Sequence, residues 1–411
     1  MHRRLTRFGP LLIAVALVLG TSQGVASANK SHSSEPTYTI AYDGPLSGGN
    51  AQLGRNMKYA VELAIKWANE GKTFGKLPFK LKYAEQDDQG LATVSPTSAE
   101  ALVTNPSVMA VVGPAFFDTA RSAEPIFWAA DLATVSPSVT NPLLAEEGWD
   151  NFFRVVADDN AQGPYDADYV AKALKVKSVY SVNVARAYDS GLAGAFDTRL
   201  KHDGVAVTHQ TAPGTTQCQA GTGDVQEYGA LASLVVSSKA PLLFYAGDYC
   251  DFALFAKALR AAGYRGQLMS DNGSLDPRYV SSAGKTVADG TLITCACSAL
   301  QNTPEDNSFE LAFKQLAGFP SGTYTPEAFD ATNVIIDAMK SLGTHITRAK
   351  IVAALHKVTY VGLTKTIHFR PNGNISDKTI FIYKVENGKI VELGSTLSLI
   401  KSFRFVASVT G

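Results

Sequence analysis

The sequence predicts an α/β fold made of two lobes of like construction. Apolar segments of strand length alternate with amphipathic segments of helical length along almost the whole chain, a pattern that favours largely parallel sheets. The order strand, polar turn, helix, strand also occurs twice, over Val111–Thr134 and over Leu243–Met269, with polar turn residues at matching places. Since a chain of 411 residues is long enough for two to three domains, each of these segments is assigned to its own lobe.

The N-terminal 28 residues have the pattern of a secretory signal peptide. Arg3, Arg4 and Arg7 precede a short apolar core over Leu11–Gly20, and Ala26-Ser27-Ala28 has the form of a cleavage site. About ten apolar residues are too few to cross a bilayer, which takes about 20. Residues 1–28 therefore predict an exported, soluble protein, periplasmic or extracellular. It is not expected to be a lipoprotein, because a lipid anchor needs a cysteine just after the cleavage site.

The first two predicted strands are each followed by a distinctive segment: a glycine-rich turn after the first and a pair of carboxylates after the second. The turn, Gly44 to Gly49, follows the first strand but lacks the residues of a phosphate-binding loop, so we expect a permissive loop at the mouth of a cleft. Asp87-Asp88 ends the second strand, where a capping or solvated role is favoured over acid–base or metal chemistry. The predicted elements are strands over 38–42 and 79–85 and helices over 53–70 and 92–104.

The central stretch, Val108 to Pro142, organises the first lobe. Val108–Val112 is an apolar strand stopped by a Gly-Pro turn, and Asp118 is predicted to be the N-cap of the next helix. A second strand over 132–135 ends in turns that carry Ser138 and Thr140. Both turns therefore follow the carboxyl ends of parallel strands, which is where ligands bind in open α/β sheets.

The same alternation continues to the end of the chain. It includes a polar connection over 154–162, a tyrosine-bearing turn over 187–191 and a turn at 247–251 that opens a helix. The last two strands form a hairpin that turns at Asn387-Gly388. The predicted helices are 163–174, 192–203, 225–238, 252–262, 307–316, 326–342 and 348–355, and the predicted strands are 178–183, 205–210, 241–245, 267–270, 292–296, 366–369, 379–385 and 389–393.

Four cysteines lie in the middle of the chain: Cys218, Cys250, Cys295 and Cys297. An even number in an exported protein predicts disulfide bonds. A bond between Cys295 and Cys297 would enclose one residue and is expected to be strained. In an extended strand both side chains point to the same side, so pairing of each with Cys218 or Cys250 is at least as plausible. A metal site is the weaker alternative.

The composition excludes several classes of partner. Hydrophobic residues make up 45% of the chain and charged residues 18%, which allows a full-sized core and argues against disorder. The formal net charge is zero and no long basic run is present, so nucleic acid is not expected as a partner.

Several short motifs of the chain, taken together, resemble those of a known protein family. The residues that carry the resemblance recur in order, from Gly44-Pro45-Leu46-Ser47-Gly48 to Asp271. The chain is similar to periplasmic substrate-binding proteins of the leucine/isoleucine/valine-binding type from ABC import systems, over about residues 38–393. The resemblance rests on these motifs: Gly44–Gly48, Asp87-Asp88, Val112-Gly113-Pro114, Ser136–Pro142, the turn at Tyr188, and Asp248-Tyr249.

The resemblance implies a type I periplasmic-binding fold: two doubly wound, Rossmann-like lobes, three hinge crossings and a ligand cleft between the lobes. It implies crossings near Ala157, Cys297 and Arg370. It divides the chain into a signal peptide (1–28), lobe 1 (37–156 and 298–369), lobe 2 (157–297 and 370–396) and a C-terminal tail (397–411).

The resemblance also implies a ligand site for an amino acid or an amide-like solute. A carboxylate would be held after the central strand and by Ser138–Thr140, and Asp271 would match an ammonium. Two positions depart from the family: Phe117 falls where a hydroxyl is usual and Leu53 where an aromatic is usual. Asp118, if turned into the cleft, would repel an anion. The expected ligand-binding residues are Leu53, Phe117, Asp118, Ser138, Thr140, Tyr188, Asp248, Tyr249 and Asp271.

The leading hypothesis is thus a solute receptor that feeds an ABC permease in the membrane, acting as a monomer without cofactor or metal. An exported hydrolase would need a nucleophile, but neither G-x-S-x-G nor H-E-x-x-H is present, so no enzyme activity is expected. A ligand sensor that signals through a partner would have the same fold and remains the alternative.

Overall fold

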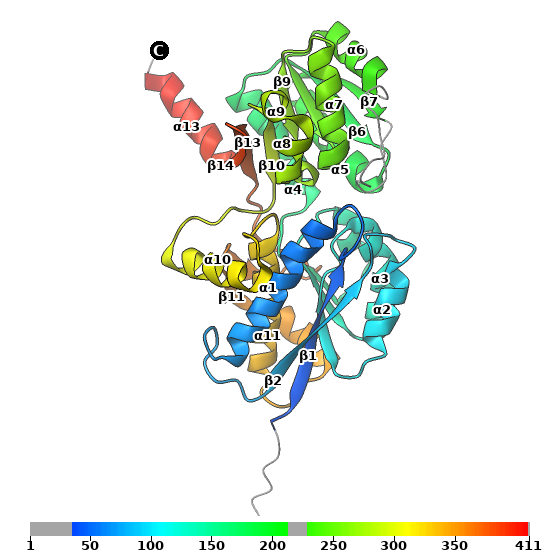
Figure 1. The fold of residues 1–411 in the computed structure, drawn as a ribbon, viewed down its shortest axis with the longest axis vertical. Helices are drawn as coiled ribbons and strands as arrows, with labels where there is room; N and C mark the ends of the chain where they lie inside the picture. The colour runs from blue at the N-terminus through cyan, green and yellow to red at the C-terminus, as the bar shows by residue number, and fades with distance from the viewer. Residues whose placement is uncertain (1–34, 213–227, 410–411) are drawn as a thin grey trace, which may run out of the picture. The chain divides into compact units, whose positions relative to one another are not determined.

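The computed structural model describes residues 35–212 and 228–409, with side chains described as far as residue 402. The predicted signal peptide and Cys218 lie outside the described residues. The chain from Glu35 onward forms one compact unit, which contains a five-stranded sheet, a seven-stranded sheet and a small two-stranded sheet. The helices and strands can be followed along the chain in Figure 1.

The five-stranded sheet is parallel throughout, in the order β2-β1-β3-β4-β5. Its apolar residues alternate between two faces, as the period of a strand requires. Ala110 and Val112 of β3 pack in the cluster that includes Met57, whereas Val111 packs with Phe127. The strands are β1 (Thr37–Gly44), β2 (Lys80–Asp87), β3 (Val108–Val112), β4 (Ala133–Ser136) and β5 (Phe152–Arg154).

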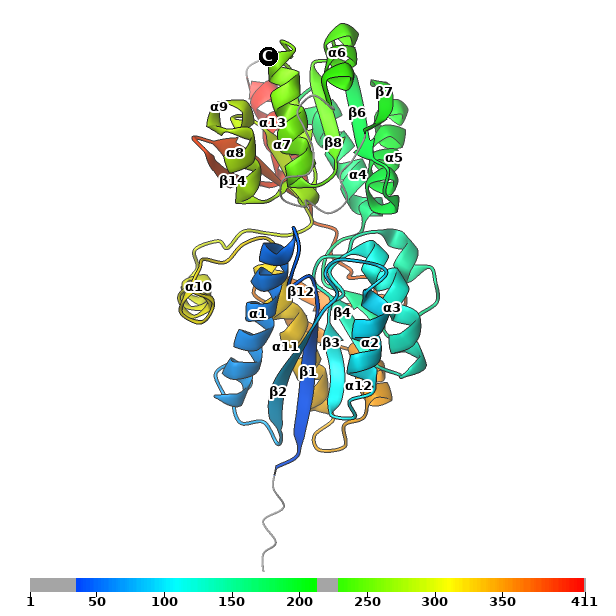
Figure 2. The ribbon, with the colours of Figure 1, turned by 45° about the vertical axis from the view of Figure 1, so that its right-hand side comes forward.

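Helices cover both faces of this sheet. One face carries α1, α11 and α12, and the other carries α2 and α3 (Figures 1 and 2). The two faces together bury the sheet, which explains why β3 is apolar along almost its whole length. The helices are α1 (Ala51–Asn69), α2 (Ser95–Val103), α3 (Phe117–Ala129), α11 (Thr325–Ser341) and α12 (Arg348–Leu355).

The seven-stranded sheet has the order β14-β13-β10-β9-β8-β6-β7. The pairs β14–β13 and β13–β10 are antiparallel and the other pairs are parallel. On one face Phe244 stacks on Phe196 of α5, and on the other Tyr245 stacks on Phe252 of α7. The strands are β6 (Ser178–Val184), β7 (Ala206–Ala212), β8 (Leu242–Ala246), β9 (Gln267–Ser270), β10 (Leu292–Cys295), β13 (Phe381–Glu386) and β14 (Lys389–Ser395).

The remaining elements cover this second sheet or connect the two. The chain passes three times between the sheets within the described residues: after β5, after β10 and after β12. The predicted two-lobed α/β fold is therefore confirmed. The elements are α4 (Asp159–Asp168), the π-helical turn η2 (Tyr169–Ala173), α5 (Ala187–His202), α6 (Gly229–Ser238), α7 (Tyr249–Ala261), α8 (Pro277–Ala283), α9 (Lys285–Ala288), α10 (Pro304–Ala317), β11 (Thr359–Val361), β12 (Thr366–His368), α13 (Thr396–Val409) and the 3-10 turns η1 (Pro142–Ala145) and η5 (Asn272–Ser274).

Four helices begin where the sequence predicted a turn or connection, and one of them, α7, begins at Tyr249 inside the turn predicted over 247–251. Helix α4 begins at Asp159, inside the predicted polar connection, and α5 begins at Ala187, so Tyr188 lies in a first helical turn. Asp118 is not an N-cap: Phe116 holds that position without a side-chain hydrogen bond, and Asp118 lies in the first turn of α3. Acidic residues are common in first helical turns because the helix dipole favours a negative charge there. The first turns of these helices are therefore as polar as a loop, and the sequence pattern predicted loops there.

The structure identifies one of the disulfide pairings that the sequence left open. Cys295 and Cys297 are bonded to each other, with their Cα atoms 5.0 Å apart, inside the range for a disulfide. The argument from an extended strand fails because β10 ends at Cys295 and the chain leaves the sheet there. Cys250 is also disulfide-bonded.

The carboxylate of Asp87 has the capping role favoured by the sequence. Its Oδ1 accepts the backbone N–H groups of Leu46 at 2.8 Å and Gln89 at 2.9 Å. The side chain thereby ties the glycine-rich turn after β1 to the turn after β2. The two loops are held together at the carboxyl ends of neighbouring strands.

Candidate ligand-binding site

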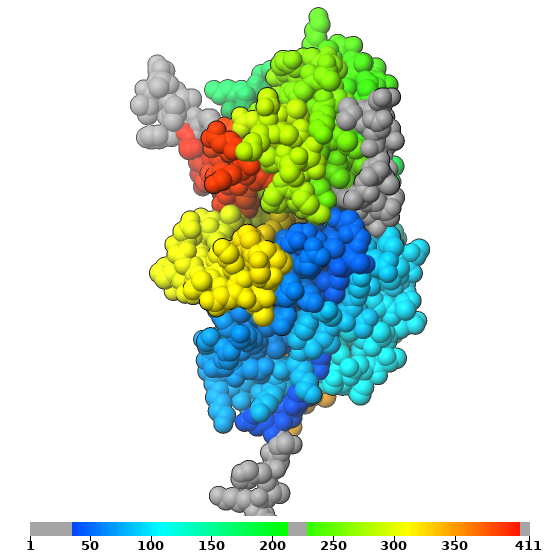
Figure 3. All heavy atoms as spheres, viewed as in Figure 1, coloured from blue at the N-terminus to red at the C-terminus, as the bar shows by residue number. Residues whose placement is uncertain are grey.

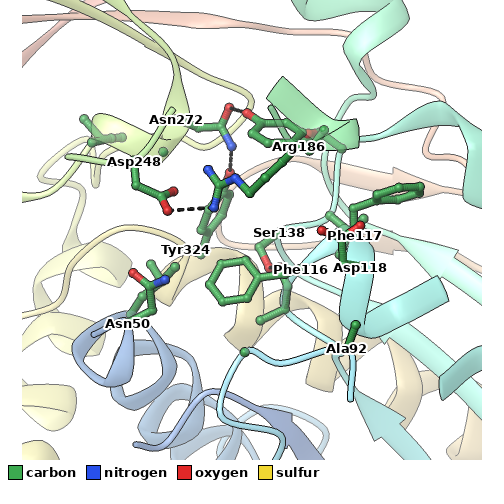
Figure 4. A pocket seen from close by; sticks show the side chains of 18 of the residues that line it. Asn50, Ala92, Phe116, Phe117, Asp118, Ser138, Arg186, Asp248, Asn272 and Tyr324 are labelled. Atoms are coloured by element: carbon green, nitrogen blue, oxygen red, sulfur yellow. Dashed lines mark hydrogen bonds and ion pairs between the residues drawn. The ribbon is translucent and has the colours of Figure 1, made fainter. Parts of the chain in front are cut away.

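A cavity of about 480 Å³ lies between the two sheets. Its walls come from the turns that follow β1, β2, β3 and β4 of the first sheet and β6, β8 and β9 of the second. All of these are carboxyl ends of parallel strands, the position where α/β sheets bind ligands. Figure 4 shows side chains of both sheets directed toward this space. The lining residues are Asn50, Leu53, Gly90, Ala92, Ala115, Phe116, Phe117, Asp118, Arg121, Ser122, Ser138, Val139, Thr140, Arg186, Tyr188, Asp248, Tyr249, Asn272, Gly273, Leu275, Asp276 and Tyr324.

The structure brings together eight of the nine predicted ligand-binding residues. These eight side chains come from five separate segments and line the same cavity. Asp271 is the exception: it is fully buried and does not line the cavity. The eight are Leu53, Phe117, Asp118, Ser138, Thr140, Tyr188, Asp248 and Tyr249.

The turn after β4 is held in place from beneath by Arg154. This arginine is fully buried, and its Nη1 donates to the carbonyl oxygens of Val139 at 3.1 Å and Asn141 at 2.8 Å. Burial lowers the pKa of Arg154 to about 10, so the side chain is still charged at neutral pH. Since the turn also carries Ser138 and Thr140, Arg154 orients the hydroxyl-bearing wall of the cavity.

Two adjacent phenylalanines at the start of α3 have different surroundings. Phe117 is buried among Ala120, Val139, Leu144 and Phe152, so most of its surface serves packing. Phe116 is directed toward the middle of the cavity in Figure 4. Its ring lies over Gly90, where an added Cβ would come within 3.0 Å of Phe116 Cε2.

A neutral hydrogen-bond network lies on the opposite wall. The hydroxyl of Tyr188 donates to Asn272 Oδ1 at 2.6 Å, and Asn272 Nδ2 donates to the hydroxyl of Tyr324 at 2.8 Å. Gln162 Nε2 donates to the same Asn272 oxygen at 3.2 Å. The network joins the turn after β9 to the N-terminus of α11, so it connects the two sides of the cavity (Figure 4).

Asp271 lies behind this network. Its Oδ1 accepts the N–H of Gly273 at 2.9 Å and its Oδ2 accepts the hydroxyl of Tyr188 at 3.3 Å. Burial raises the pKa of Asp271 well above its usual range, and the nearby carboxylate of Asp189 acts in the same direction. The side chain that faces the cavity at this turn is therefore the amide of Asn272.

Arg186 places a guanidinium in the cavity wall. Its Nε and Nη2 donate to the two oxygens of Asp189 at 2.7 and 3.2 Å, and its Nη1 donates to Asp248 Oδ2 at 2.8 Å. Burial raises the pKa of Asp189 to about 7, although the guanidinium opposes this rise. The two carboxylates raise the pKa of Arg186 further above its usual value, so the guanidinium stays charged.

The rim of the cavity is closed by a second arginine. Arg278 of α8 lies 4.3 Å from the ring centre of Tyr249, donates to the carboxylate of Asp276 at 2.7 Å and donates through Nη1 to the carbonyl oxygen of Gly49 at 3.0 Å. Figure 3 shows the blue segment that contains the β1–α1 turn in contact with the green segment that contains α8.

Sequence reasoning missed the polar residues that form the network and the cation. Arg186, Asn272 and Tyr324 were not among the predicted site residues, although each follows a predicted strand or precedes a predicted helix. For Asn272 a signal was present, because an Asn-Gly pair directly after a buried strand predicts an exposed turn. No local pattern distinguishes Arg186 from a solvated arginine.

Within the described part of the chain, each helix is too short or too polar to cross a membrane. The sequence profile of a family described as periplasmic binding protein matches residues 37–389. A Leu/Ile/Val-binding protein homolog 3 from Brucella melitensis is 27% identical over 361 residues, which are 86% of this chain and 93% of that protein.

Solved structures have the same two-lobed fold. A leucine-binding protein from Thermotoga maritima superimposes with a TM-score of 0.76 at 23% identity, covering 87% of this chain and 98% of that one. A solute-binding protein of an ABC transporter from R. palustris, in complex with benzoate, gives 0.75 at 17% identity, covering 88% and 96%. Since the family profile matches most of the sequence, this chain belongs to the periplasmic binding protein family.

Proposed function

We propose that this protein is the extracytoplasmic solute receptor of an ABC importer and that it binds a small organic molecule in the cavity between its two sheets. The observation that carries the proposal is the cavity itself, which is lined by the carboxyl ends of strands from both sheets. Family membership and the names of the relatives support a receptor for amino acids or similar solutes.

The binding step in this proposal is hinge closure of two lobes. Lobe 1 comprises residues 37–156 and 298–369, and lobe 2 comprises 157–297 and 370–396. The hinges lie near Ala157, Cys297 and Arg370, close to the three passages of the chain between the sheets. Closure would remove the ligand from water and present surfaces of both lobes to a permease.

The contacts of the crossing at Cys297 support a hinge there. The hydroxyl of Tyr383, on β13, donates to the carbonyl oxygen of Cys297 at 2.9 Å. The next residue, Ser298, donates its N–H to the buried carboxylate of Glu327 on α11 at 2.9 Å. Cys297 is thus attached to lobe 2 and the next residue, Ser298, to lobe 1. A rotation of one lobe relative to the other would therefore take place between these two residues.

The ligand contacts in the proposal come from both walls. Ser138, Thr140 and the free first-turn N–H groups of α3 would contact polar groups of the ligand, and Tyr188 and Tyr249 would close over the rest of the molecule. Leu53 and Phe117 would shape the apolar part of the cavity, and Asp118 and Asp248 would set its charge. The relatives named above support a carboxylate ligand, because leucine and benzoate both carry one.

The remaining parts of the proposal concern export and partners. Residues 1–28 would be removed on export, and the mature chain would work as a monomer with a membrane permease. A ligand sensor would bind its solute in the same way, so a pull-down of the closed form with membrane proteins would separate the two roles.

The test is a binding screen followed by a measurement of closure. Mature protein is screened by thermal shift against amino acids, amides, organic acids, polyamines and sugars; a ligand at 100 times its dissociation constant should stabilise the fold by about 2.7 kcal/mol. For each hit, small-angle scattering should show a smaller radius of gyration with ligand than without. A panel without any hit, or hits without compaction, would contradict the receptor function.

A further inference from the structure

We propose that the ligand is an organic acid with a carboxylate and no ammonium group, and that the guanidinium of Arg186 binds the carboxylate. This inference rests on the proposed receptor function and narrows its ligand to one chemical class. It departs from the amino-acid ligand that the sequence predicted.

Arg186 is built into the cavity wall as a fixed cation. Asp189, which is fully buried, accepts from Nε and Nη2 and so holds the guanidinium side-on. With the bond to Asp248, three of the five N–H groups of the arginine are engaged. Within the described residues the other two, on Nη1 and Nη2, have no protein acceptor, and the side chain remains 25% exposed where it lines the cavity. A planar pair of N–H donors suits a carboxylate.

The neutral network on the wall opposite α3 offers no charged partner to an ammonium group. Asp271, the predicted partner, lies behind Tyr188 and does not reach the cavity. The residue that does reach it, Asn272, is neutral, and its oxygen already accepts from Tyr188 and Gln162. An ammonium placed there would lose its water without gaining a charged partner, which is costly in a buried site.

The other carboxylates of the cavity wall are engaged or peripheral. Both oxygens of Asp276 accept from Arg278, at 2.7 to 3.1 Å. Asp248 is bonded to Arg186 itself. Asp118 is exposed in the first turn of α3, where the helix dipole favours a negative charge. Two arginines of the described residues line the cavity. Arg121 is 56% exposed and is paired with Glu147 at 3.4 Å, so Arg186 is the one whose guanidinium is fixed in the wall by hydrogen bonds and still has donors to spare.

The rest of the cavity is suited to an apolar or aromatic body. Leu53, Phe116, Val139, Tyr249 and Leu275 line it from both sheets. Burying such a body is favourable by about 25 cal/mol per Å² of apolar surface. The geometry points to a branched aliphatic or aromatic acid.

The first experiment compares matched ligands by isothermal titration calorimetry on the mature protein. One set is leucine, 4-methylpentanoate and 3-methylbutylamine; the other is phenylalanine, 3-phenylpropanoate and phenethylamine. We expect at least one acid to bind tenfold or more tightly than its amino acid and its amine. If an amino acid or amine binds as tightly as its acid, or if the panel screen identifies a ligand with an ammonium group, the organic-acid assignment is wrong although the receptor function stands. If no compound in either experiment binds and compacts the protein, the receptor function itself fails.

The second experiment changes the guanidinium. The double variant R186Q/D189N removes the cation together with Asp189, its fully buried partner, so that no charge is left unpaired at the buried position; Asp248, the other partner of Arg186, is 13% exposed to water. We expect a loss of acid affinity of thirtyfold or more. R199Q is the matched control, because Arg199 lies on the same helix, is paired with Asp168 and Asp203 and does not line the cavity; it should change affinity less than twofold. Equal effects of the two changes would contradict the role of Arg186.

A third variant separates an acid from a zwitterion by the sign of the effect. D248N removes a negative charge beside the proposed carboxylate site, so acid affinity should rise two- to tenfold. If Asp248 instead pairs with an ammonium, the same change would lower affinity tenfold or more, which would overturn the proposal. Circular dichroism and thermal unfolding establish that each variant is folded.

Discussion

The guanidinium of Arg278 donates a hydrogen bond of 3.0 Å to the carbonyl oxygen of Gly49, which lies 229 residues earlier in the chain. Gly49 belongs to the turn between β1 and α1, and Arg278 belongs to α8, beside the second sheet. The hydroxyl of Thr323 likewise donates to the carbonyl oxygen of Leu275. These bonds join the two sides of the cavity rim, so in the proposed mechanism they exist in the closed form and break on opening.

Changing Arg278 to Gln should therefore weaken ligand binding, because it removes contacts at the rim with Gly49, Tyr249 and Asp276. A hydrogen bond to a charged group contributes about 1.5–3 kcal/mol and an ordinary one about 0.5–1.5 kcal/mol; since the rim is partly exposed, we expect a loss of about three- to tenfold in affinity. The loss arises because a smaller fraction of the molecules is closed. Calorimetry gives the affinity, and small-angle scattering should show compaction only at higher ligand concentration.

Arg265 provides the control for this prediction. It donates to the carbonyl oxygens of Arg260 and Tyr264, both within its own lobe, so R265Q should leave the affinity within twofold of the wild type. A normal affinity for R278Q would mean that the rim bond plays no part in closure.

The core of the second sheet is expected to be sensitive to truncation. Leu243 of β8 is fully buried, and Leu243→Ala should lower the free energy of unfolding by about 2–5 kcal/mol through lost transfer energy and a residual cavity. Leu234 of α6 is 53% exposed, so Leu234→Ala should change it by about 0.5 kcal/mol or less. Urea titration of both variants checks the difference; similar losses would contradict the assigned burial of β8.

Glu124 should make the stability of the protein depend on pH. It is fully buried on α3 and accepts from Thr134 Oγ1 at 2.7 Å and Asn151 Nδ2 at 3.1 Å. Burial raises the pKa of Glu124 to about 8. Between its unfolded pKa, about 4.3, and 8 the folded state binds more protons than the unfolded state, so this stabilising contribution is complete below about pH 4 and is lost as the pH rises.

Burial also raises the pKa of Asp159 and of Glu327 to about 7, so these groups add to the pH dependence of the wild type. Comparison of the wild type with the variant Glu124→Gln isolates the contribution of Glu124. The free energy of unfolding of the wild type minus that of E124Q should fall from pH 5 to pH 8, with a slope of up to about 1.4 kcal/mol per pH unit. Urea titrations at four pH values measure it. A difference that stays constant or grows with pH would show that Glu124 is ionised throughout.

The bond between Cys295 and Cys297 should contribute little to stability for a disulfide. It closes a loop of three residues, and the chain-entropy relation gives about 1.6 kcal/mol for a loop of this length. Replacing both cysteines by alanine should lower the free energy of unfolding by about that amount, measured by urea titration without reductant. A loss above about 4 kcal/mol would mean that the bond does more than restrict the unfolded chain.

Several elements could be predicted almost to the residue. The strands β3 and β9 and the helix α12 have the predicted bounds, because each is an uninterrupted run with one clear period between strong turn residues. Helix α4 was placed four residues too late, since Asp158, Asp159 and Asn160 are as polar as a loop although two of them belong to the first helical turn. The predicted C-terminal tail is the helix α13, and Ile400 packs it against η2 and α5.

The location of the candidate site could be predicted from the sequence, but the charged and polar groups that face the ligand could not. Its location followed from strand order, because the carboxyl ends of parallel strands meet at one edge of a sheet. The choice between Asp271 and Asn272 did not follow, since both come directly after the same strand, and only the turn of the backbone at η5 decides which one faces the cavity.

The fold class, the two-lobed plan and the edge of each sheet at which a ligand can bind follow from the amino-acid sequence, because hydrophobic period and turn residues act over a few positions. The pairs of groups that meet across long distances become visible only in the folded chain. Arg186 meets Asp248, 62 residues away, and Asn272 meets Tyr324, 52 residues away. Such pairs depend on burial and on distances set by the whole fold, and these decide which charges a cavity presents.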